Sequence, residues 1–380
     1  MLSVLILFGV SLIIYVLVRI QPGENFVRTK YSMQLAQDGT GETEQMVSEM
    51  EVTYGFKKRL VDDDGNYIME GIHYTYREVG PFEGYWLWLA NILHGDWGDS
   101  FIFSVDSGKT EKYYIVEDSD GTHYIPYEKE SEIPDGALTQ ERMIATQSVI
   151  RVIYTKCGIS FVISLIATIF EFLIAIPLGI ISATKQYGVL DYTVTVLAMM
   201  GISLPTFFLG ALMLKAFSID LDWFPYAGLV DPNSGLPTIV DNMYHLVLPL
   251  STLIILSIGG LMRYTRTNML EVLNADYIRT ARAKGLSEHS VIYKHAFRNS
   301  LIPIVTMLAG ILPGLFGGAM ITETVFSIDG IGKAAYKAVT SGDIPFIMAY
   351  NMFLSLLTVI GTLMSDLMYA VVDPRVKIGD

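Results

Sequence analysis

Long apolar stretches constrain this chain more than any other feature of its sequence. They recur along its 380 residues, at residues 2–20, 158–183, 193–217, 245–261, 301–321 and 346–371. About 20 apolar residues is the length that an α-helix needs to cross the hydrocarbon core of a bilayer. Charged residues make up 17% of the chain, below the roughly 25% typical of soluble domains. The sequence therefore predicts an all-α membrane bundle of six transmembrane helices.

The first apolar stretch has two interpretations. A cleaved signal peptide would begin with basic residues and end at a small-residue cleavage site, and neither is obvious before or near Gln21. An uncleaved first membrane helix over residues 1–20 is therefore favoured. Arg19 would lie at its outer end and extend its guanidinium group into water.

Residues 21–145 are hydrophilic and acidic. Between residues 21 and 156 the chain has 12 basic and 24 acidic side chains, a balance of −12 out of a net charge of −13. This acidity argues against nucleic acid as a partner. Turn residues at 62–66 and 118–121 lie between runs rich in Tyr, Ile and Val, which is the pattern of β-hairpins. We expect a small α+β domain outside the membrane, because the translocation of so long a segment does not depend on its charge.

The polar stretch at residues 263–300 is basic. It has seven basic and three acidic side chains, a balance of +4, and lies between two apolar spans. Short basic loops of membrane proteins face the cytoplasm. With six spans, this orientation also puts both termini in the cytoplasm.

The same stretch carries local signals for two helices joined by an elbow. Leu273, Tyr277 and Ala281 recur at helical spacing, with Ile278 beside them, and predict one helix. Lys284 and Gly285 are typical of a helix C-terminus, and Ser287 followed by Glu288 is typical of the next N-terminus. A short helix presented in this way suits a groove on a soluble partner.

Motifs for catalysis, nucleotide binding and metal binding are missing from the sequence. Residues 327–334 come nearest to a phosphate-binding loop, but Ser and Ala replace its first Gly and its final Ser or Thr. The acidic turn at residues 62–65 lacks the ligand spacing of an EF-hand, which favours a solvated turn over a calcium site. Cys157 is the single cysteine, so a cysteine-based metal cluster is excluded. We expect no catalytic residue, metal or cofactor in this chain.

Two carboxylates lie within the predicted spans. Glu171 is the deepest, and Asp366 lies toward the end of the last span. An ionisable group in a membrane is costly, so a role in a transport pathway is the default hypothesis. A hydrogen bond that fixes helix packing is the alternative for both.

Residues 279–285, with the sequence RTARAKG, and residues 294–303, with KHAFRNSLIP, resemble the cytoplasmic coupling loop of ABC importer permeases. The general form of that loop has Glu-Ala-Ala and then Gly four residues after the second Ala. This chain has Arg279-Thr280-Ala281 and then Gly285, a departure that is usual in the oligopeptide and dipeptide branch. Three further segments resemble the same branch, at residues 84–101, 323–332 and 366–375.

The resemblance implies roles for particular residues. It implies the type I importer fold, with the first permease helix at 1–20, an extracellular domain at 21–145, a permease core at 146–372 and a cytoplasmic tail at 373–380. The residues implied to dock on an ATPase are Arg279, Ala281, Arg282, Lys284, Gly285, Leu286, Ser287 and Glu288. Those implied to contact a substrate-binding protein are Trp97, Asp99, Glu323, Gly330 and Gly332.

The resemblance also implies a function and partners. The chain would be a permease subunit of a bacterial-type cytoplasmic membrane, working with a second permease, two ATPases that bind ATP and Mg²⁺, and an external substrate-binding lipoprotein. Its substrate would be a peptide, while nickel, glutathione and oligosaccharides stay open as alternatives. A self-sufficient secondary transporter or a receptor is the rival class, and the lack of an obvious inverted repeat weakens the transporter version.

Overall fold

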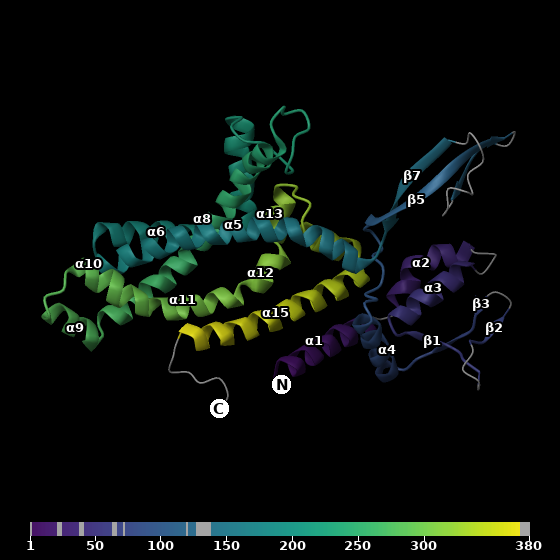
Figure 1. Cartoon of the computed structure of the whole chain (residues 1–380), viewed down its shortest axis with the longest axis horizontal. Coiled ribbons are helices and arrows are strands. Elements are labelled where there is room, and N and C mark those ends of the chain that lie inside the picture. Colours follow the sequence, from purple (N-terminus) through teal and green to yellow (C-terminus); the bar gives the residue numbers. More distant parts are fainter. Residues whose placement is uncertain are drawn as a thin grey trace. The chain divides into compact units, whose positions relative to one another are not determined.

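The computed structural model describes residues 2–20, 25–37, 42–62, 67–70, 73–118, 121–126 and 138–372 (Figure 1). The described chain is mostly helical and divides into two compact units. The helical unit comprises Met1–Phe8, Lys156–Lys337 and Met352–Asp380, and the α/β unit comprises Gly9–Thr155 and Ala338–Asn351. Each unit is described by itself below.

The elements after residue 148 are helices. They are α5 (Val149–Thr184), α6 (Val189–Ser203), α7 (Thr206–Met213), the π-helix η2 (Leu214–Asp220), α8 (Thr238–Leu273), α9 (Asp276–Ala283), α10 (Glu288–Ser290), the π-helix η3 (Val291–Phe297), α11 (Arg298–Gly310), α12 (Leu312–Gly317), α13 (Met320–Val325), α14 (Ile331–Ser341) and α15 (Ile344–Val372). Among the described residues, α5, α8 and the segment Ile344–Met368 are long and apolar enough to cross a membrane. The six-span count therefore stays a prediction.

Two of the predicted spans are broken rather than continuous. The span at residues 193–217 bends by 101° between α6 and α7, and counts as a fourth crossing only if the bent pair is one span. Leu204 has an extended conformation there, because a residue that precedes a proline is driven out of the α region. The span at residues 301–321 is divided among α11, α12 and α13, with Gly318 at a positive φ of 73°.

Glycines let α8 approach its neighbours closely. A Cβ on Gly201 of α6 would lie 2.5 Å from the carbonyl oxygen of Ile255, and one on Gly259 of α8 would lie 2.4 Å from that of Ala198. A Cβ on Gly179 of α5 would lie 2.7 Å from Cβ of Thr265. Contacts this short require small residues, as is usual where helices pack in membranes.

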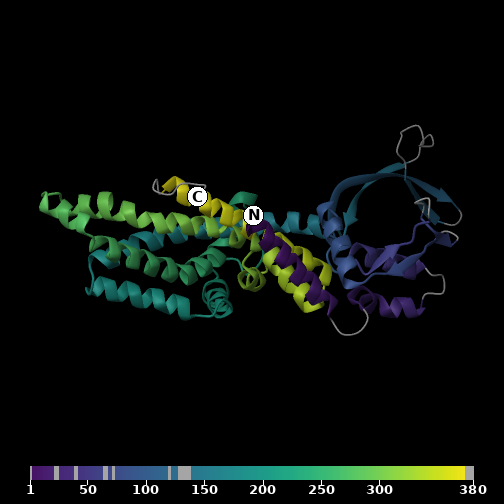
Figure 2. The same ribbon diagram turned by 90° about the horizontal axis from the view of Figure 1, so that it is seen from below.

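The α/β unit contains the first helices and the described strands. Its elements are residues 9–19 of α1 (Leu2–Arg19), α2 (Phe26–Gln37), α3 (Glu42–Thr53), β1 (Lys57–Arg59), β2 (Met69–Glu70), β3 (His73–Tyr74), β4 (Tyr76–Glu78), α4 (Pro81–Leu93), β5 (Val105–Asp118), β6 (Gly121–Pro126) and β7 (Leu138–Thr146). It also includes the start of α5, the end of α14 and the start of α15. The strands pair antiparallel as β1–β4, β2–β3 and β6–β5–β7. Figure 2 shows the paired β5, β6 and β7 as a curved ribbon.

Both hairpin predictions fall on this unit. The pairing of Asp118 with Gly121 joins β5 to β6 and confirms the second hairpin, although residues 119–120 lie outside the described residues. Val61 bridges to Tyr67 in antiparallel fashion, as the first hairpin requires. Residues 63–66 of its turn also lie outside the described residues.

Arg19 does not extend freely into water as expected from the sequence. Its guanidinium group donates hydrogen bonds to the carbonyl oxygens of Gly55, at 3.0 Å, and of Val79. It also lies 4.7 Å from the centre of the Phe56 ring. Because an arginine fork matches several acceptors at once, Arg19 ties α1 to the loops that flank the β1–β4 pair.

Acidic side chains of α3 are held by basic partners. Glu51 is 1% exposed, and its carboxylate lies 2.8 Å from both Arg28 and Lys57. Burial acts to raise the pKa of Glu49, but hydrogen bonds from Arg59 and Tyr76 outweigh it and hold that pKa below its usual value. The opposing charges of this unit are thus partly paired.

The α/β unit is expected to lose stability in acid. A carboxyl group with a lowered folded-state pKa stabilises the fold above its unfolded pKa of about 4.3, and that contribution is lost as the pH falls through the folded-state value. Three of the four tryptophans (Trp86, Trp88 and Trp97) lie in this unit. Their fluorescence during melts at pH 6, 5, 4 and 3 should show a falling midpoint, and Glu49→Gln should flatten the dependence. An unchanged midpoint at pH 3 would contradict this prediction.

Candidate functional site

The basic stretch folds into two short helices joined by a sharp elbow. Helix α9 ends at Ala283, Lys284 is its C-cap, and Gly285 has a positive φ of 79°, which glycine adopts without steric cost. The N–H of Gly285 donates to the carbonyl of Arg282 at 2.9 Å, and that of Leu286 donates to Ala281 at 3.4 Å. This pair of bonds is the Schellman arrangement that closes a helix C-terminus. The predicted end at Lys284 and Gly285 is confirmed.

The second half of the elbow is capped as the sequence predicts. Ser287 precedes α10, and its side chain accepts a hydrogen bond from the backbone N–H of Ser290. Arg282 and Glu288 form an ion pair of 2.9 Å across the elbow. Both side chains are largely exposed, so this pair contributes about 1 kcal/mol or less. The elbow is therefore held mainly by its backbone bonds and by packing.

One face of the elbow is buried in the helical unit. The buried cluster contains Ile278 and Ala281 of α9, Val291 and Ala296 of η3, Ile180 and Ala183 of α5, and Met269 of α8. Figures 1 and 2 show α9 and α10 at the end of the helical unit where α5 gives way to α6. The elbow is thus anchored directly on the ends of two long helices.

The prediction of one helix with Leu273, Tyr277 and Ala281 on a single face was partly wrong. Tyr277 is 48% exposed, and Leu273 ends the preceding helix α8 rather than belonging to α9. Ile278 and Ala281, three residues apart, point inward instead. Over so short a helix, a spacing of three or four residues fits more than one face, and only the packing against α5 and α8 selects between them.

The opposite face of the elbow is exposed and partly apolar. Tyr277 and Tyr293 are each 48% exposed, and Leu286 at the tip is 42% exposed. Arg279 lies beside them with 71% of its side chain exposed. Exposed aromatic and apolar groups next to arginine make up the composition of protein–protein contact sites.

A buried ion pair lies close to this elbow. Asp191 of α6 is 3% exposed and accepts two hydrogen bonds of 3.0 Å from the guanidinium group of Arg266 on α8. It also accepts from the Ser182 hydroxyl of α5 and from the backbone N–H of Tyr187. Asp191 thus joins three helices beside the elbow. Sequence analysis missed this pair, and its only local signal is that each residue lies near a predicted cytoplasmic end of a span.

Glu323 is predicted to contact a partner, and in this chain it is buried, at 1% exposure. Its carboxylate accepts hydrogen bonds from the Ser160 hydroxyl at 2.7 Å and from the backbone N–H groups of Ala319 and Lys333. The Ser160 oxygen in turn accepts from the N–H of Ile331 at 2.9 Å. In this structure Glu323 holds the loop between α13 and α14 against α5.

Gly330 and Gly332 pack against the same carboxylate. A Cβ on Gly330 would lie 2.4 Å from the Ser160 hydroxyl oxygen and 2.5 Å from a Glu323 carboxylate oxygen. Gly330→Ala is therefore expected to destabilise the helical unit by about 1–3 kcal/mol through overpacking. Gly314→Ala is the matched control, because nothing lies within 4 Å of its Cβ position. Thermal unfolding in detergent should separate the two variants, and equal melting temperatures would contradict the packing argument.

The remaining predicted site residues are dispersed. Glu171 lies partly buried near the middle of α5. Asp366 is exposed near the end of α15. Trp97 is half-buried and Asp99 is exposed, both in the loop after α4 of the α/β unit. Their predicted roles in a pathway or in partner binding stay predictions.

Comparison with known proteins identifies the family. Residues 175–378 match the model of the binding-protein-dependent transport system inner membrane component, a segment that holds the elbow, the Asp191–Arg266 pair and the Glu323 loop. The chain belongs to this family. It is a permease component of an ABC importer and a multi-pass membrane protein, which confirms the family predicted from the coupling-loop motifs.

Curated relatives of this permease include peptide permeases. The oligopeptide transport system permease protein AppB of Bacillus subtilis (strain 168) is 39% identical over 218 residues, which span 57% of this chain and 69% of AppB. The dipeptide transport system permease protein DppB of the same organism is 36% identical over 220 residues, which span 58% of this chain and 68% of DppB. A chain of the MetNI methionine ABC transporter, solved in inward-facing conformations, is similar with a TM-score of 0.48 and 16% identity, covering 60% of this chain and 99% of that one.

Proposed function

We propose that this permease moves peptides across a bacterial-type cytoplasmic membrane and that partner ATPases power the movement. Peptide as the substrate is supported by the names of the relatives, which are oligopeptide and dipeptide permeases. The partners in this proposal are a second permease, two ATPases that bind ATP and Mg²⁺, and an external substrate-binding lipoprotein. This chain contributes the passage and no catalytic residue.

The observation that carries the proposal is the two-faced elbow. Its inner face packs on α5 and α8, while its outer face presents Tyr277, Leu286 and Tyr293. We assign the outer face to a cleft of the ATPase, in the way an amphipathic helix enters a groove on its partner. Movement of the ATPases would then displace the elbow together with the helix ends on which it packs.

The proposed topology has six crossings in the type I importer fold. Both termini and the basic elbow face the cytoplasm, in line with the excess of basic residues at 263–300. The acidic α/β region between the first and second crossings faces outward. There Trp97 and Asp99 are candidate contacts for the substrate-binding protein, whereas the burial of Glu323 favours a structural role for that loop.

Glu171 is the residue we assign to the pathway within the bundle. An ionisable group at this depth is costly and is usually retained for function. Glu171→Gln should reduce uptake while the amount of protein in the membrane stays unchanged. Glu271→Gln, at an exposed position of α8, should leave both unchanged. Wild-type uptake by the Glu171 variant would rule out a pathway role.

The overall function is tested in proteoliposomes that contain the complete complex. We expect uptake of labelled peptides to require ATP and the binding protein. Competition by unlabelled nickel, glutathione or oligosaccharides identifies the substrate class. Peptide accumulation in vesicles that lack the ATPases would contradict the proposal and favour a secondary transporter. If one of the other substrates inhibits uptake and peptides do not, the ATP-driven mechanism still holds, but the substrate belongs to another class.

A further inference from the structure

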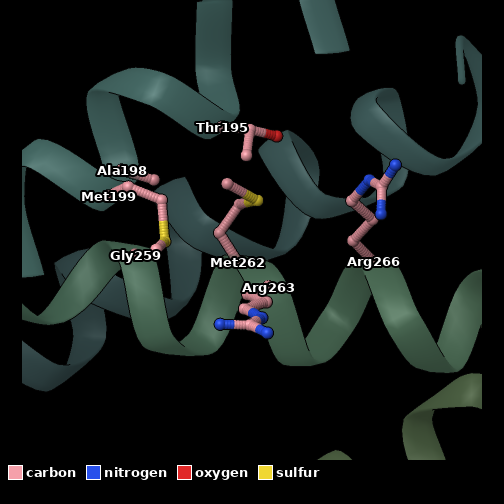
Figure 3. A pocket seen from close by; sticks show the side chains of 7 residues that line it. All are labelled: Thr195, Ala198, Met199, Gly259, Met262, Arg263 and Arg266. Carbon is pink, nitrogen blue, oxygen red and sulfur yellow. The ribbon is translucent and has the colours of Figure 1, made fainter. Parts of the chain in front are cut away.

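A cavity lies between α6 and α8, beside the elbow. Its volume is about 270 Å³, and its walls include Ala198 and Met199 of α6 and Gly259 and Met262 of α8 (Figure 3). The helices touch where Gly259 meets the backbone of Ala198. They are joined again near the elbow by Asp191 and Arg266. The cavity occupies the space between these two points.

Two arginines and Thr195 are the polar residues that line this cavity, and its other lining residues are apolar. Arg266 donates hydrogen bonds from Nε and Nη2 to Asp191, so the carboxylate neutralises its charge. Arg263 is exposed and forms no ion pair with any residue that the structure describes. In Figure 3 its guanidinium group lies over α8, apart from that of Arg266. The lining residues therefore carry one uncompensated positive charge.

We propose that this cavity binds one anionic phospholipid of the phosphatidylglycerol type. A guanidinium group matches a phosphate in a bidentate geometry, and the single negative charge of this headgroup equals the charge that is left over. The methionines Met199 and Met262 provide a flexible apolar surface for the glycerol and the first acyl carbons. Basic pockets between helices on the cytoplasmic side are suited to such headgroups.

The size of the cavity agrees with this occupant. At about 270 Å³ it lies just below the range of small-molecule pockets, so it accommodates a headgroup or an acyl segment but not a whole lipid. The remaining acyl chains would lie in the bilayer along α6, whose Val196 and Met200 are 56% and 59% exposed. The inference goes beyond the proposed transport function and uses the proposed topology only to choose the inner leaflet.

The test uses the complete complex, stripped of lipid in detergent and then titrated with phosphatidylglycerol or phosphatidylcholine, with bound lipid counted by native mass spectrometry. We expect about one tightly bound phosphatidylglycerol per permease and weak binding of phosphatidylcholine. Arg263→Gln should weaken phosphatidylglycerol binding about five-fold, the effect of one lipid-facing arginine. Arg298→Gln, an exposed arginine at the start of α11, should leave it unchanged.

Further variants keep the proposal open to refutation. Met199→Trp should fill the cavity and weaken binding without a change of charge. A benzophenone amino acid at position 199 should form an adduct with lipid; an adduct with the partner permease would make this face a subunit interface. Displacement of the lipid by equimolar glycerol 1-phosphate would instead indicate a soluble phosphate ligand. Either result, or equal binding by Arg263→Gln and the wild type, would overturn the proposal.

Discussion

Asp191→Ala is expected to destabilise the helical unit by about 3 kcal/mol, the lower end of the cost of breaking a buried ion pair. The wild-type carboxylate accepts hydrogen bonds from Arg266, Ser182 and the Tyr187 backbone. Its removal leaves the Arg266 guanidinium group, 26% exposed, without its anion. The same change also removes the hydrogen-bond acceptor that connects α5, α6 and α8. Thermal unfolding in detergent and the yield of folded protein from membranes both measure this loss.

An exposed ion pair provides the control for this change. Lys215 and Asp220 also form an ion pair, but their side chains are 67% and 51% exposed. Asp220→Ala should therefore cost less than about 1 kcal/mol. The double variant Asp191→Ala with Arg266→Met should recover part of the lost stability, because it removes the stranded charge. If Asp191→Ala has the same melting temperature as the wild type, the ion pair does not stabilise the fold.

Leu286→Asp is expected to abolish most of the ATPase binding and leave the permease folded. Leu286 is 42% exposed at the tip of the elbow, so a carboxylate there stays in water in the free protein. Docked in an apolar cleft it would be desolvated, at a cost of about 2 kcal/mol or more, which corresponds to roughly 30-fold weaker binding. Co-purification of the ATPases and peptide-stimulated ATP hydrolysis measure the effect.

Two comparisons separate docking from folding. Leu236→Asp changes a leucine of similar exposure, 46%, in the segment before α8, and should leave ATPase binding unchanged. Ala281→Asp buries its charge in the elbow's own core and should lower the melting temperature as well as ATPase binding. ATPase retained by Leu286→Asp at the wild-type level would refute the docking role of the elbow. That result would leave the packing of the elbow on α5 and α8 untouched.

Local chemistry explains which parts of the elbow were predictable. The end at Gly285 and the cap at Ser287 depend on residues within five positions of each other, so the sequence alone indicates them. The inward face of α9 depends on Ile180 and Met269, which are far away along the chain. Periodicity over eight residues could not select that face, and it grouped Tyr277 with Ala281 although only Ala281 is buried.

The buried carboxylates that sequence analysis did not predict to be buried have distant partners. Asp191 and Arg266 are 75 positions apart, and Ser160 and Glu323 are 163 apart. Each carboxylate is buried only because another helix brings a hydrogen-bond donor to it, and no local sequence pattern predicts such a contact. The bend after Ser203 is different, because the conformational restriction that Pro205 imposes on Leu204 is a local signal.

The shared core of the elbow has a mechanical consequence. Val291 and Ala296 of η3 pack in one cluster with Ile180 of α5 and Met269 of α8, so the elbow has no soft layer beneath it. We therefore expect a push on its tip to move the adjoining ends of α5 and α8 together with the elbow.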